Sequence, residues 1–164
     1  MKQAGFSLVE ILIFTTIVAL FFVLGAAVMI FSLRQMQVAQ HRIVATREAE
    51  SLISWFKSAK EVNWGGAECS GCAAGTSAFT EQVSRVTHNL VYPTICFNTL
   101  DWLADDVCSP SDYSLDGLYK REAKFTYAVV SGYISQVTVA VTVYWRESGE
   151  SYQVTSNTVL SVWE

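Results

Sequence analysis

The sequence predicts an α+β protein, in which a long N-terminal helix packs on a C-terminal antiparallel β-sheet of three to four strands. Two observations carry this prediction. An apolar run near the N-terminus passes into an amphipathic repeat, and no proline occurs before Pro93, which together predict one helix over about 6–62. From Lys120 onward the apolar period changes to two residues, the repeat of a strand with one buried face.

The first half of the helix, residues 6–33, is predicted to lie in a membrane. Positions 11–33 hold no charged residue, and a helix of that length spans ~34 Å, enough to cross the hydrocarbon core of a bilayer. A secretory signal peptide cleaved near Gly25 is the alternative, but the apolar run continues well past that position. Basic residues follow the run more closely than they precede it, which conflicts with an outside C-terminal domain under the positive-inside rule.

The second half of the helix, residues 34–64, is predicted to be amphipathic and to cover the sheet. Gly65 and Gly66 supply its stop, because glycine readily adopts the left-handed conformation past a helix end. The polar face is expected to carry Arg34, Gln37, Arg47, Glu48 and Lys57. Spacings of three and four predict one buried stripe made of Met36, Ala39, Ile43, Thr46, Ala49 or Glu50, Ile53 and Phe56.

The last segment, residues 120–164, is predicted to form the sheet. Valines alternate with small or hydroxyl residues over 137–143, which suits a strand with one buried face. Turns are expected at Ser131-Gly132 and at 147–150, so the neighbouring strands fall at about 124–130 and 152–162. The apolar face of this sheet needs a cover, and the amphipathic half of the helix is the expected partner.

The segment between helix and sheet, residues 65–119, is a variable acidic region. It is expected to contain a short helix at 80–89 and a short strand at 91–97. Residues 61–119 carry one basic and eight acidic side chains, a balance of −7, whereas five basic and two acidic side chains give residues 34–60 a balance of +3. A broad nucleic-acid footprint needs clustered Lys and Arg, so nucleic acid is not an expected partner. The basic group Lys120, Arg121 and Lys124 is interpreted as strand-edge charge.

The acidic region contains all four cysteines, Cys69, Cys72, Cys96 and Cys108. An even number beyond an export segment favours disulfides formed in an oxidising compartment. We favour the pairs Cys69–Cys72 and Cys96–Cys108 among three possible connectivities. A redox site at Cys69 and Cys72 lacks the strand and helix setting that lowers a thiol pKa, and a four-cysteine zinc site lacks paired ligand spacing. The aspartates of this region match no calcium-loop spacing, so neither a metal nor a cofactor is expected.

Glu10 is the residue that most needs an explanation. A carboxylate inside an apolar helix costs roughly 2.5–3.5 kcal/mol on insertion scales, so such residues usually have a partner or a function. One interpretation is that Glu10 sits at the membrane interface and reaches water. The other depends on its neighbours, because a short leader ending in Gly5 precedes Phe6-Ser7-Leu8-Val9-Glu10 and the apolar run.

This junction resembles the precursor motif of type IV pilins and of the pseudopilins of type II secretion and DNA-uptake systems. The resemblance implies that residues 1–5 are a leader peptide, which a prepilin peptidase removes between Gly5 and Phe6 before methylating the new amine. It places Glu10 at the fifth mature position, where it meets the N-terminal amine of a neighbouring subunit during assembly. Ala27 stands where many major pilins have a proline, which favours a minor pilin or a pseudopilin.

The same resemblance implies a structural subunit rather than an enzyme. The expected partners are prepilin peptidase, other pilin or pseudopilin subunits, the inner-membrane assembly platform and the membrane. The expected location is the cytoplasmic membrane, with a single pass and the C-terminal domain outside the cytoplasm, followed by a cell-surface or periplasmic filament. The alternative is an uncleaved, membrane-anchored binding or redox module that uses Cys69 and Cys72.

Overall fold

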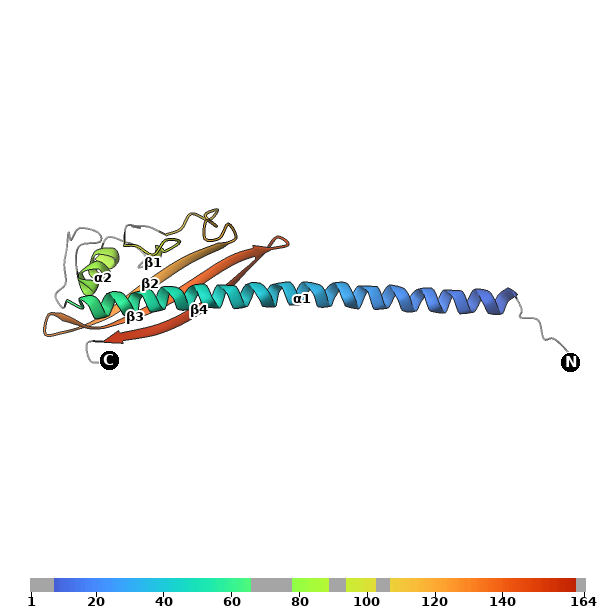
Figure 1. Ribbon diagram of the computed structural model, residues 1–164, viewed down its shortest axis with the longest axis horizontal. Coiled ribbons are helices and arrows are strands. Elements are labelled where there is room, and N and C mark those ends of the chain that lie inside the picture. The colour runs from blue at the N-terminus through green and yellow to red at the C-terminus, as the bar shows by residue number, and fades with distance from the viewer. Residues whose placement is uncertain (1–7, 66–77, 89–93, 103–106, 162–164) are drawn as a thin grey trace. The chain divides into compact units, whose positions relative to one another are not determined.

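A computed structural model describes residues 8–65, 78–88, 94–102 and 107–161. Its elements are α1 (Leu8–Val62), α2 (Phe79–His88), β1 (Thr94–Cys96), β2 (Tyr119–Val130), β3 (Tyr133–Glu147) and β4 (Glu150–Ser161) (Figure 1). The predicted α+β fold is confirmed, with one long N-terminal helix and a four-stranded antiparallel sheet. The chain divides into two compact units, residues 1–40 and 41–164, and α1 contributes to both.

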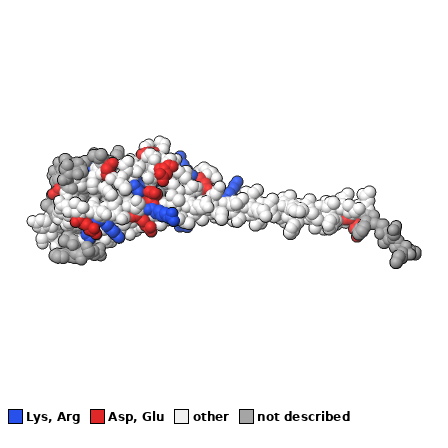
Figure 2. Space-filling view, viewed as in Figure 1, with Lys and Arg blue, Asp and Glu red and all other residues white. Residues whose placement is uncertain are grey.

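The first unit consists, where it is described, of the apolar part of α1. Nearly all of its side chains are exposed, and Figure 2 shows the long uncharged stretch of this helix. The hydroxyls of Thr15 and Thr16 donate to the carbonyls of Leu12 and Ile13, at 3.0 and 2.8 Å. Both hydroxyls therefore have a hydrogen-bond partner within the helix. By length and composition this helix is apolar enough to cross a membrane.

The sheet of the second unit has the strand order β1-β2-β3-β4, with every neighbouring pair antiparallel. Two-residue turns at Ser131-Gly132 and Ser148-Gly149 join its long strands, and all four turn residues have positive φ, as tight hairpin turns require. The predicted turns and period-two alternation are confirmed. The buried residues of β3 are Ile134, Val137, Val139, Val141, Val143 and Trp145.

The core of this unit lies between the sheet and the later turns of α1. The buried residues of α1 are Ala45, Ala49, Leu52, Ile53 and Phe56. Phe56 is at its centre, with its ring centroid 5.2 to 5.5 Å from those of Phe97, Phe125 and Trp102. Edge-to-face and tilted aromatic pairs add to the free energy of area burial, so this cluster joins α1, β2 and the segment after β1 into one core.

The predicted stripe on α1 is wrong in its first half. Met36 is 60% exposed and Ile43 is 56% exposed, whereas Ala49, Ile53 and Phe56 are buried as predicted. The expected spacings averaged fewer residues per turn than the 3.6 of an α-helix, so the stripe drifted around the helix. The observed buried positions keep the true helical period instead.

The interpretation of Arg121 as strand-edge charge is also wrong. Its side chain is 2% exposed and lies on the core face of β2, with Ala123 and Phe125. Glu48, predicted to lie on the polar face, is half-buried and pairs with Arg121. Arg121 shares the odd numbering of the buried residues of β2, so strand parity was the signal that could have found it.

The end of α1 is fixed by contacts with the start of α2. The backbone N–H groups of Phe79 and Thr80 donate to the carbonyls of Asn63 and Trp64, both at 2.9 Å. Gly65 has φ +75°, and a Cβ at this position would lie 2.6 Å from the Cβ of Ala78. The predicted helix stop therefore requires glycine for both its conformation and its close approach.

Candidate functional site

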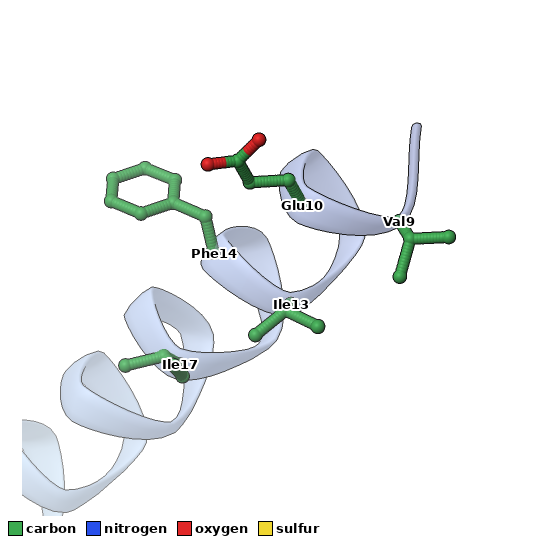
Figure 3. Close-up of a pocket in the computed structure, with 5 residues that line it drawn as sticks. All are labelled: Val9, Glu10, Ile13, Phe14 and Ile17. Atoms are coloured by element: carbon green, nitrogen blue, oxygen red, sulfur yellow. The ribbon is translucent and has the colours of Figure 1, made fainter. Parts of the chain in front are cut away.

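Glu10 lies in the first described turn of α1. Figure 3 shows the Glu10 carboxylate on the same side of the helix as the Phe14 ring, one turn further along. This position results from the i to i+4 spacing of the helix.

Apolar side chains surround Glu10. Val9, Ile13, Phe14 and Ile17 line, together with Glu10, a shallow hollow of about 410 Å³ (Figure 3). All four are more than half exposed. Within the described residues, Glu10 makes no hydrogen bond and no ion pair. The chain therefore presents one anionic group inside an apolar surface that its own described residues leave uncovered.

The remaining sequence-predicted residues fall into two groups. Gly5 and Phe6, the predicted processing site, lie outside the described residues, as do Cys69 and Cys72. Cys96 and Cys108 form a disulfide, so this half of the predicted pairing is confirmed. Cys96 and Cys108 belong to the second unit, whereas Glu10 belongs to the first.

The Cys96–Cys108 bond connects the end of β1 to the segment before β2. Cys108 is buried, and its Sγ lies 3.5 Å from the carbonyl oxygen of Arg121. The carboxylate of Asp112 lies 3.9 Å from Cys96 Sγ. A cysteine coordinates metal as a thiolate, and these two sulfurs are bonded to each other, so a zinc site that uses all four cysteines is incompatible with this bond.

The structure also contains a buried polar connection that the sequence did not reveal. The Nε of Arg121 donates to the carbonyl of Phe97 at 2.8 Å, and its Nη1 donates to the carbonyl and carboxylate of Glu48, at 2.9 and 3.2 Å. Burial lowers the pKa of Arg121, and the charge of Glu48 opposes this effect. The guanidinium therefore ties β2 to α1 and to the residue after β1.

A second polar contact lies at the start of the second unit. His41 Nδ1 is 2.8 Å from the hydroxyl of Tyr119 on β2. Burial raises the pKa of Tyr119, and the carboxylates of Asp116, Glu147 and Glu48 raise it further. The phenol therefore stays protonated as the partner of the imidazole at neutral pH.

Comparisons of this chain with protein-family models, with curated proteins and with solved structures found no match.

Proposed function

We propose that this chain is a pilin-like structural subunit, a minor pilin or pseudopilin, that joins or primes a type IV pilus-type filament. The observation that carries the proposal is Glu10, one carboxylate ahead of an uncharged, exposed helical stretch that continues through 33. An apolar surface of this size requires lipid or other helices as its surroundings. In the proposed subunit, lipid surrounds this helix in the membrane, and the helices of other subunits surround it in the filament. Its apolar surface is therefore covered both before and after assembly.

The position of Glu10 gains a physical purpose from cleavage between Gly5 and Phe6. Cleavage creates an N-terminal amine, a cation, close to the position where a buried anion is costly. Pairing the amine of one subunit with Glu10 of its neighbour offsets both desolvation penalties. Since only one axial offset between two helices brings the charges together, the pair sets the register of assembly.

The proposal includes the partners and location of such a subunit. Prepilin peptidase and the inner-membrane assembly platform act on the N-terminal segment, and other pilin or pseudopilin subunits pack against α1. The second unit lies outside the cytoplasm, where thiols are oxidised. The disulfide between Cys96 and Cys108 supports this side of the membrane.

The processing part of the proposal is tested by mass spectrometry of the chain from cells that contain prepilin peptidase. The expected N-terminus is N-methylated Phe6, and it requires the peptidase. A chain that still begins at Met1 beside an active peptidase contradicts the proposal and favours an uncleaved anchor.

The assembly part is tested by the Glu10→Gln variant, which keeps the side-chain shape and removes the charge. We expect normal membrane insertion and folding but loss of incorporation into sheared filament or pseudofilament fractions. Glu50→Gln is the matched control, because Glu50 is an exposed carboxylate of the same helix. Equal incorporation of the Glu10→Gln and Glu50→Gln variants would refute the pairing.

A further inference from the structure

The outer edge of β4 is long, and no other strand of the described residues pairs with it. β4 is the last strand of the sheet, and it pairs with β3 over its whole length without a bulge. Glu147 and Glu150 flank the two-residue turn and form a hydrogen-bonded pair, so alternation assigns the next such pairs to even-numbered residues of β4. The backbone groups of Ser151, Gln153, Thr155, Asn157 and Val159 therefore point away from the sheet.

These outward groups have no partner in the part of the chain that the structure describes. No backbone hydrogen bond joins the outer edge of β4 to another segment. Proteins usually protect such an edge with lysine, proline, a bulge or a short strand. β4 has none of these features, and its one charged residue is Glu150 at its start.

A groove runs beside the second half of this edge. Its volume is about 540 Å³, and it is lined by Lys57, Lys60 and Glu61 of α1 and by residues 157–160 of β4. An added strand could place its inward side chains in this space, because alternate residues of a strand point to opposite faces. Two cations and one carboxylate give the lining a positive balance.

The opposite edge of the sheet is β1. The N–H of Phe97 donates to the carbonyl of Arg121 at 2.8 Å, so alternation points the backbone groups of Thr94 and Cys96 outward. The carboxylate of Asp112 lies 3.9 Å from the Sγ of Cys96 in this strand. The groove beside β4 therefore has a positive balance, and a carboxylate lies next to β1.

We propose that the β4 edge of one copy binds the β1 edge of a second copy in the same orientation. Because all neighbouring strands are antiparallel, β1 runs opposite to β4 in the same sheet, and two copies placed side by side form an antiparallel pair without inversion. Such a contact joins two different surfaces and repeats from copy to copy, as an open filament requires. This inference deepens the proposed function and rests on it. Confinement of the copies to one membrane raises their effective concentration, which favours a contact as short as β1.

The test uses the full chain in its membrane, with a benzophenone amino acid at position 157 and a mixture of isotope-labelled and unlabelled copies. Irradiation is expected to join two copies, with the adduct on residues 94–98 of the second. The same probe at Ser54, an exposed residue of α1 rather than of β4, serves as the control position. Adducts on β4 of the second copy, on another protein alone, or on no chain would overturn the proposal.

A backbone variant keeps the test specific to strand pairing. Gln153→Pro removes an outward N–H without loss of a β3 partner, and Gln153→Ala keeps that N–H. Gln153→Pro removes one hydrogen bond between the two copies and weakens the bonds next to it. We therefore expect an adduct yield roughly tenfold lower in Gln153→Pro than in Gln153→Ala. Equal yields from these two variants would refute strand addition. If only the edge contact is wrong, the strand variants have no effect but Glu10→Gln still abolishes incorporation. If the proposed function is wrong, Glu10→Gln itself has no effect.

Discussion

Arg121 is a buried cation of β2 whose guanidinium hydrogen bonds reach two other parts of the second unit, α1 and the residue after β1. A buried ion pair often contributes little compared with an apolar replacement of the whole pair, but removing one partner leaves the other uncompensated. For Arg121, that partner is the half-buried Glu48, together with the carbonyls of Phe97 and Glu48 itself. The contribution of Arg121 to the stability of the fold therefore depends on the presence of both Arg121 and Glu48.

We expect Arg121→Met to lower the free energy of unfolding by about 3 kcal/mol, because it removes the donor to the Glu48 carboxylate and to the Phe97 carbonyl. The measurement is urea unfolding of the full chain in detergent, followed by tryptophan fluorescence. Lys124→Met is the control, since Lys124 is exposed on the same strand and should change stability by less than ~0.5 kcal/mol. The double variant Arg121→Met/Glu48→Leu should recover part of the loss, and no recovery would argue against a coupled pair.

Tyr119 predicts a pH dependence at the alkaline end. Its pKa is raised in the folded state, above the usual value of about 10, by burial and three carboxylates. As pH rises through about 10, the unfolded state loses this proton first, so the folded state loses stability between the two pKa values. We expect the melting temperature to fall above about pH 10 and to fall less steeply in Tyr119→Phe. Identical slopes for both chains would show that Tyr119 does not contribute.

At the scale of elements, α1 changes its surroundings along its length while remaining one helix. Ile43 is 56% exposed although it belongs to the second unit, and Phe56 is fully buried. Both are large apolar residues that a sequence pattern treats alike. Only the position of each residue relative to the sheet separates them.

The register of α1 can therefore be tested with two truncations. Phe56→Ala should lower the free energy of unfolding by about 3–5 kcal/mol, because it opens a cavity among aromatic rings. Ile43→Ala should lower it by less than ~0.5 kcal/mol in the unassembled chain. Chemical denaturation of each variant supplies the comparison, and a large loss from Ile43→Ala would mean that the helix presents another face to the core.

The elements were more predictable than the contacts between them. Proline-free sequence, valine alternation and turn residues specify the helix and hairpins locally, so their existence and approximate limits follow from the chain. The burial of Arg121 and the exposure of Met36 depend on which faces meet, and this is a tertiary property. Glu10 was identified from sequence because its spacing from Gly5 and its apolar surroundings are local, whereas the bond between His41 and Tyr119 joins residues far apart in the chain.

At the scale of the whole molecule, the two units differ in whether the chain itself buries their apolar side chains. Residues 41–164 have a continuous core from α1 to the sheet. The described part of residues 1–40 leaves its apolar side chains exposed. One unit carries its own core, and the other requires an apolar environment.

A fragment of residues 41–164 should therefore fold alone in water. We expect cooperative urea unfolding and near-ultraviolet circular dichroism typical of fixed aromatic packing. The full chain in the same buffer should require detergent or lipid to remain dispersed. A fragment without a cooperative transition would mean that the first unit contributes to the fold of the second.

The disulfide between Cys96 and Cys108 also has a consequence for the order in which the chain matures. In the proposed location of the second unit outside the cytoplasm, this bond forms after synthesis, once its segment has reached an oxidising compartment. Before that moment β1 is held to β2 by a register of only three residue pairs. The proposal therefore implies that a newly made copy lacks this bond at its β1 edge and that oxidation adds it as a step of maturation.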